Sequence, residues 1–136
     1  TIWSPLRSGF LTGKYLDGIP DDSRATQDGY DWLLNDLEER RERGEYEVVA
    51  KLVDFAAQLR CTPAQLALAW CLKNRNVSTI LMGATTSAQI QDNLGCIDVA
   101  KILTEDDMSK IEDILSNKPD SWMGPGGTGT RKLKTL

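Results

Sequence analysis

Apolar residues recur along the chain at the spacing of three helices. From Glu45 onward they fall at intervals of three and four, as on one face of an amphipathic helix: Val48, Val49, Leu52, Phe55, Ala56 and Leu59. Residues 63–74 are apolar nearly all round, which predicts a helix buried between layers with Trp70 in the core. A third helix is predicted near the end of the chain, with four apolar residues facing inward: Met108, Ile111, Ile114 and Leu115.

Capping residues mark where two of these helices are expected to begin. Thr62 is a good N-cap, Pro63 follows at the first helical position, and Gln65 stands in capping-box position. Thr104 has the same capping role before the last helix. The sequence therefore predicts both helix starts from local side-chain chemistry.

A strand, a turn and a helix are predicted over residues 77–95. Four of the residues in 77–81 are β-branched or apolar, as in a strand covered on both faces: Val77, Thr79, Ile80 and Leu81. Gly83 then allows a turn or the close approach of a ligand. Thr86 is the predicted N-cap of a helix, with Gln89 in capping-box position and Gly95 as its C-terminal stop. Such a helix start is a natural phosphate site, although many units of this kind bind no anion, and both interpretations stay open.

The other strand signal lies at the start of the chain. Ile2 and Trp3 are typical of the end of a strand, which Pro5 would stop. Strands separated by helical stretches predict parallel pairing and an α/β fold. Because two strands do not make a stable parallel sheet, and because Thr1 is not a methionine, we expect the chain to be a piece of a longer protein.

Two charged segments are candidates for function. Residues 5–26 predict a long loop, rich in Gly, Pro, Asp and Ser, with a helical turn at 8–12. Lys14 and Arg24 in this loop could clamp an anion or could be two solvated side chains. In residues 38–43 arginines interleave with glutamates, which favours a solvated helix face over a basic patch.

Composition argues against several classes of protein. The 136 residues carry a formal charge of −4 at pH 7, whereas a nucleic-acid-binding surface usually brings a basic excess. No segment is long and apolar enough to span a membrane, and no signal peptide is visible. Three cysteines without framework spacing and the lack of histidine favour reduced thiols, a cytoplasmic location and no metal site.

Three segments resemble the aldo-keto reductase family. WSPLRSGFLTGKY at 3–15 and GIPDDSR at 18–24 are similar to the loop after the seventh barrel strand, and GATTSAQIQDN at 83–93 is similar to the phosphate-binding segment after the eighth. The resemblance implies that residues 1–119 are the C-terminal portion of a (β/α)8 TIM barrel, about strands 7 and 8 with their helices, incomplete as a barrel on its own. Residues 120–136 are expected to be a flexible tail.

Within that family the chain looks most like the β-subunits of voltage-gated potassium channels. The similar positions are GY-x-W-L at 29–33 and SNKP at 116–119. One hypothesis is an NADP-dependent reductase of aldehydes and ketones. The other is a cytosolic, homotetrameric β-subunit that reports redox state to a channel α-subunit and lies peripherally at the membrane. A truncated, inactive isoform is a third possibility.

The resemblance implies a nicotinamide-binding role for the first loop. Trp3 would stack on the nicotinamide ring, while Lys14 and Arg24 would neutralise the phosphates. Further positions would line the cofactor: Ser4, Pro5, Leu6 and Ser8.

The second segment would hold the adenosine end. Gly83 and Thr85 would approach the adenosine phosphate, Gln89 would bind near the 2′-phosphate, and Asp92 and Asn93 would meet the adenine. Many family members carry Lys and Arg at the positions of Gly83 and Gln89. NADP recognition would therefore depend here on neutral groups and on the start of the helix. The alternative interpretation of Gln89 is that it is a capping residue and does not bind the cofactor.

The family's chemistry is hydride transfer to a carbonyl, with a tyrosine as proton donor. The resemblance places this tyrosine and its Lys, Asp and His partners upstream of Thr1. Tyr15 and Tyr30 belong to the cofactor loop and to a connecting segment, so neither is expected to be catalytic. We therefore expect no catalytic residue in this chain and no activity of the piece alone.

Overall fold

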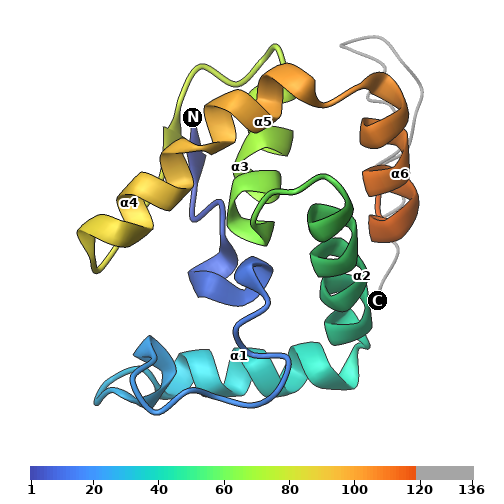
Figure 1. Cartoon of the computed structure of the whole chain (residues 1–136). Helices are drawn as coiled ribbons and strands as arrows, with labels where there is room; N and C mark the ends of the chain where they lie inside the picture. Colours follow the sequence, from blue (N-terminus) through green and yellow to red (C-terminus); the bar gives the residue numbers. More distant parts are fainter. Residues whose placement is uncertain (119–136) are drawn as a thin grey trace, which may run out of the picture.

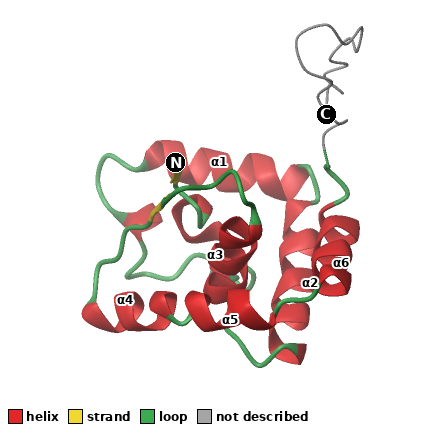
Figure 2. Ribbon diagram, turned by 90° about the horizontal axis from the view of Figure 1, so that it is seen from above, coloured by secondary structure: helices red, strands yellow, loops and turns green. Residues whose placement is uncertain are grey.

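The computed structural model describes residues 1–118. The tail predicted at 120–136 and Pro119 of the 116–119 motif lie outside the described residues. The elements run in the order β1 (Ile2–Trp3), the 3₁₀ turns η1 (Arg7–Thr12) and η2 (Arg24–Thr26), α1 (Asp31–Glu42), α2 (Glu45–Gln58), α3 (Pro63–Lys73), β2 (Ile80–Leu81), α4 (Ser87–Leu94), α5 (Cys96–Ile102) and α6 (Glu105–Leu115). The described part is thus mostly helical, with one small sheet (Figure 1, Figure 2).

The sheet consists of β1 and β2, which pair in parallel as predicted. Ile2 lies opposite Ile80 and Trp3 opposite Leu81. The expectation that residues 77–81 form a strand buried on both faces is wrong. Only Ile80 and Leu81 are strand; Ile80 packs against the core, whereas Leu81 is 56% exposed and Trp3 beside it 81% exposed. The reason is that α3 contacts β2 from one side, and no second layer among the described residues covers the other.

Helix α3 is the centre of the larger core. It packs against α2, α4 and α5, and Figure 1 shows it surrounded by these helices. The predicted capping box is present: Thr62 Oγ1 accepts from Gln65 N, and Gln65 Oε1 accepts from Thr62 N. Trp70 packs against the core as expected, but α3 is not buried all round, since Leu72 is 40% exposed.

The predicted stop at Gly95 is confirmed, since α4 ends at Leu94 and Gly95 is its C-cap. A further helix that was not predicted, α5, begins at the next residue, so α4 and α5 run on almost end to end (Figure 1). Three buried residues of α5 and the segment after it join the core around α3: Cys96, Val99 and Leu103. This packing holds α5 against α3 directly after the end of α4.

A second core cluster anchors the first loop. Phe10 and Tyr15 of that loop are buried against residues of α1 and α2: Leu33, Leu37, Tyr46 and Val49. The expectation that residues 38–43 are a solvated face is wrong for Arg40, which is 4% exposed. In both views α1 lies on the opposite side of α3 from α4 and α5 (Figure 1, Figure 2).

All three cysteines, Cys61, Cys71 and Cys96, are free thiols, as expected. No helix of the described residues has the length and apolar character to cross a membrane.

Candidate functional site

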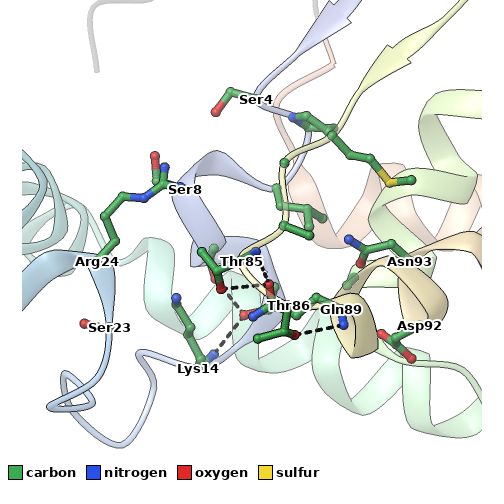
Figure 3. A pocket seen from close by; sticks show the side chains of 18 of the residues that line it. Ser4, Ser8, Lys14, Ser23, Arg24, Thr85, Thr86, Gln89, Asp92 and Asn93 are labelled. Carbon is green, nitrogen blue, oxygen red and sulfur yellow. Dashed lines mark hydrogen bonds between the residues drawn. The ribbon is translucent and has the colours of Figure 1, made fainter.

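An open pocket lies at the carboxyl ends of the two parallel strands. Its volume is about 1070 Å³, and it is lined by the loop after β1, the loop after β2 and the N-terminal ends of α3 and α4 (Figure 3). Because β1 and β2 are parallel, the loops that leave them emerge at the same edge of the sheet. Residues separated by about half of the sequence thus share one cavity.

Eleven of the twelve residues predicted to bind the cofactor line this pocket: Ser4, Pro5, Leu6, Ser8, Lys14, Arg24, Gly83, Thr85, Gln89, Asp92 and Asn93. The twelfth, Trp3, does not line it; it lies in β1, directly before Ser4. Several polar lining residues were not predicted: Thr12, Asp22, Ser23, Gln27, Tyr30, Thr62 and Thr86. Three of them stand at positions that the sequence marks, because Thr62 and Thr86 are predicted N-caps and Ser23 directly precedes Arg24.

The first loop holds an unusual backbone. Three non-glycine residues, Ser4, Arg7 and Ser8, have φ between 50° and 57°, and Gly9 follows with φ 92°. This left-handed conformation costs energy for residues with a Cβ and tends to occur at functional sites.

Nearby contacts hold the strained loop in place. The Tyr15 hydroxyl donates to Ser8 O at 3.3 Å, and Thr12 Oγ1 donates to Gly9 O at 2.7 Å. Gly9 also makes room for Lys14, because a Cβ at Gly9 would lie 2.7 Å from Lys14 Cε. The Lys14 side chain can thus lie over the loop that lines the pocket.

Two cations on this side of the pocket have aromatic neighbours in place of acidic partners. Lys14 Nζ lies 4.8 Å from the ring centre of Tyr15, and Arg24 Cζ lies 5.7 Å from that of Tyr30. Neither cation forms an ion pair with another described residue. Their donors therefore remain available to an anionic ligand.

The start of α4 forms the opposite wall. Thr86 Oγ1 accepts from Gln89 N at 3.2 Å, so the predicted N-cap is confirmed. The other half of the capping box is wrong: Gln89 Oε1 accepts from Thr85 N at 2.8 Å and from Thr85 Oγ1 at 3.1 Å, in place of Thr86 N (Figure 3). With its oxygen held by Thr85, the Gln89 amide has its NH₂ group left to donate.

Gly83 leaves the pocket open next to this wall. A Cβ at Gly83 would meet no atom within 4 Å, and its φ is not left-handed. The glycine is therefore not required by a turn. The free space beside it is what a closely approaching ligand needs.

At the far end of α4 the two predicted adenine residues differ in their surroundings. The Asp92 carboxylate accepts from Thr62 Oγ1 at 2.9 Å and from Gln65 Nε2 at 3.0 Å. Asn93 is 4% exposed, lines the pocket and makes no side-chain hydrogen bond to another described residue. The protein thus satisfies Asp92 internally and leaves Asn93 to a ligand.

Tyr15 and the three cysteines, as candidates for acid–base or nucleophilic chemistry, do not line the pocket. Tyr15 is buried with its hydroxyl on a backbone carbonyl, and burial raises the pKa of each thiol, Cys61, Cys71 and Cys96. No cluster of metal-ligating side chains is found within residues 1–118. The lining is suited to binding an extended anion.

One family model matches this chain, that of the aldo/keto reductase family, over residues 1–116. This family is built on the TIM barrel, and the small open sheet with its helices is consistent with an incomplete piece of such a barrel. Its members generally use a nicotinamide cofactor and act on carbonyl substrates. The pocket at the strand ends lies where ligands bind in this fold. The chain belongs to the aldo/keto reductase family and therefore to a family of oxidoreductases.

Proposed function

We propose that the pocket binds NADP(H), and that the chain is the cofactor-binding part of an aldo/keto reductase that reduces aldehydes or ketones. The observation that carries the proposal is that eleven residues from two distant segments line one pocket at the strand ends. Local structure alone would not bring residues 4–24 and 83–93 together. Their convergence supports one ligand long enough to contact both segments.

The charges around the pocket fit the phosphates of a dinucleotide. Lys14 and Arg24 come from the first loop, and the N-termini of α3 and α4 add the positive ends of two helix dipoles. These groups lie on both sides of the cavity, so a pyrophosphate between them would be neutralised from two directions. Asp22 is a carboxylate on the lining and would favour a position for the phosphates nearer to the cations.

Gln89 supports NADP over NAD. Its oxygen is held by Thr85, which leaves the amide NH₂ as a donor at the pocket wall. A 2′-phosphate is an acceptor only and pairs well with donors, whereas a 2′-hydroxyl gains less from them. The preference rests on neutral donors and the α4 start, so we expect it to be moderate.

The bound cofactor would supply the hydride for carbonyl reduction, and this chain would bind and orient it. Ser4, Ser8 and the strained backbone between them offer fixed polar groups, and Trp3 stands exposed at the end of β1 next to them. The proton must come from elsewhere, because the tyrosine hydroxyl nearest to this loop is bonded to Ser8 O. We infer that the proton donor and its partners belong to polypeptide outside these 136 residues.

A regulatory role is the second candidate function. The segment 29–33 resembles the potassium channel β-subunits, and Tyr30 of this segment lines the pocket beside Arg24. In that role the same pocket would report the redox state of the cofactor at a channel, from the cytoplasmic side. Binding of a channel α-subunit by the full-length protein would favour it, whereas turnover without such binding would favour the metabolic reductase.

The proposal predicts that Lys14 and Arg24 hold the phosphates. We expect Lys14→Ala and Arg24→Ala each to weaken NADPH binding about tenfold or more, because each removes a charge-assisted contact. The measurement is a titration with NADPH and NADH that follows tryptophan fluorescence. Lys51→Ala, an exposed lysine on α2 away from the pocket, is the control and should bind like the wild type. Wild-type affinity in both pocket variants would contradict the phosphate role.

A further inference from the structure

A small hydrogen-bond network at one end of the pocket joins the start of α3 to the C-terminal end of α4. Gln65 of α3 donates from Nε2 to Asp92 O at 2.8 Å and to Asp92 Oδ1 at 3.0 Å. Thr62 Oγ1 donates to Asp92 Oδ2 at 2.9 Å. Gln65 Oε1 meanwhile accepts from the backbone Thr62 N, so the three residues are linked to one another. Both carboxylate oxygens of Asp92 are therefore engaged by the protein.

Gly95 provides the space in which the Gln65 amide lies. A Cβ at Gly95 would stand 2.5 Å from Gln65 Nε2 and 3.0 Å from Gln65 Cδ. Gly95 has φ −57° and ψ −18°, angles that alanine adopts without strain. Glycine is thus not needed here for the backbone, and the close approach of Gln65 is the physical reason for it.

Asn93 is the neighbour that this network would orient. It follows Asp92 in α4 and lines the pocket, and its side chain forms no hydrogen bond with another described residue. Its polar atoms are not fully enclosed, so the amide can donate to or accept from a ligand in the pocket. Because Asp92 is fixed by its carboxylate and by its backbone carbonyl, the adjacent residue is held in one place.

We propose that Thr62, Gln65 and Asp92 are positioning residues for the adenosine end of the cofactor. Gly95 leaves the space in which the Gln65 side chain makes these contacts. In this arrangement Asp92 fixes α4 against α3, so that the Asn93 amide is held at the pocket where the adenine would lie. The inference rests on the proposed function, since it assigns the two ends of a dinucleotide to the two ends of the pocket.

Gly95→Ala tests the network without removing any polar group. The added methyl displaces the flexible end of Gln65 and leaves helical backbone angles intact. The probes are adenosine 2′,5′-bisphosphate, which carries only the adenosine end, and reduced nicotinamide mononucleotide, which carries only the other. We expect Gly95→Ala to bind the bisphosphate about tenfold more weakly in calorimetry, with unchanged affinity for the mononucleotide.

Three further variants sharpen the result. Gln65→Ala should give the same selective loss, and the double variant Gly95→Ala/Gln65→Ala should be no weaker than Gln65→Ala alone, because the two changes act through one contact. Lys101→Ala, an exposed residue of α5 that pairs with Asp98, should bind both probes like the wild type.

The possible outcomes separate this inference from the function that it rests on. If the wild-type chain binds neither NADPH nor the bisphosphate, the proposed function fails first. If the wild type binds and Gly95→Ala binds the bisphosphate equally well, the positioning role is refuted. Equal losses of affinity for both probes would also refute the positioning role, because they would show that the network only stabilises the fold. An unfolded circular dichroism spectrum in both single variants would have the same meaning.

Discussion

Arg40 connects the pocket loop to the helices beneath it. Its guanidinium donates to both oxygens of Asp36, at 2.8 and 2.9 Å, and also pairs with Glu45. The same group lies 5.0 Å from the ring centre of Phe10, which belongs to the loop that lines the pocket. Burial alone would lower the pKa of Arg40, but Asp36 and Glu45 outweigh this effect and raise it. The charge is thus retained and paired inside the second core cluster.

Replacement of Arg40 by methionine should destabilise the fold. The variant leaves Asp36 and Glu45 without their partner, and since both carboxylates are partly exposed we expect a loss of about 2 kcal/mol. Arg40→Lys should not restore the loss, because one ammonium cannot bind both oxygens of Asp36 as the guanidinium fork does. Urea unfolding measures the effect.

Arg43→Met is the matched control for that measurement. Arg43 pairs with Glu39 and Glu45, but its side chain is on the surface, so the change should lower the free energy of unfolding much less than Arg40→Met does. Equal losses at the two positions would show that burial of Arg40 adds nothing.

Single residues also show where prediction from the sequence fails. Residues 38–43 contain three arginines in a charged run, and no local pattern says that Arg40 is the buried one. The lining residues in 4–24 and 83–93 were predicted because whole motifs resemble the family. The partners of Gln89 and Asp92 were not predicted, because they depend on the approach of Thr85 and of α3.

The starts of three helices were predicted, whereas one helix was missed. The N-caps Thr62, Thr86 and Thr104 are all present, since each accepts from a backbone N–H only three residues away. The end of α4 at Gly95 was also predicted, and the missed element is α5, which begins at the next residue. Whether a second helix follows a glycine stop depends on what the chain packs against, here α3, and a sequence pattern does not contain that information.

The cap of α6 should make stability depend on pH. Thr104 donates to Asp107 from its hydroxyl at 2.7 Å and from its backbone N–H at 3.0 Å, and these bonds lower the pKa of Asp107. A lowered folded-state pKa stabilises the fold above the unfolded-state value of about 4, and this contribution disappears as the pH falls through the folded-state pKa.

Asp107→Asn is the variant that isolates this effect. At neutral pH it should lower the free energy of unfolding by about 0.5 kcal/mol, and the difference from the wild type should shrink below about pH 4. Urea unfolding between pH 2 and 7 gives both profiles, with Asp113→Asn of the same helix as a control that should follow the wild type. A constant difference at all pH values would contradict the assignment.

At the scale of the whole molecule, the sheet is open and its outer face is apolar. Several large side chains of the described residues are exposed on or beside it: Trp3, Leu81, Met82, Leu94 and Ile97. A parallel sheet is stable only with neighbouring strands and with cover on both faces. One face of the sheet is therefore packed against α3, and the other is an uncovered apolar face that a complete barrel of this family would cover.

The α/β class and the parallel pairing followed from the alternation of strands and helices. The barrel assignment did not: it came from the resemblance of 3–24 and 83–93, and the family match over residues 1–116 supports it. The second core cluster was missed because Phe10 and Tyr15 lie in a segment without periodicity. Their burial depends on α1 and α2, which fold over them from later in the chain.

Hydrogen–deuterium exchange with and without NADPH tests the central claim most directly. If one cofactor spans both segments, backbone amides in residues 4–24 and 83–93 should gain protection together, while those of α6 on the far side of the core should change little. Protection of only one segment, uniform protection of the whole chain, or none at saturating NADPH would contradict a shared cofactor pocket.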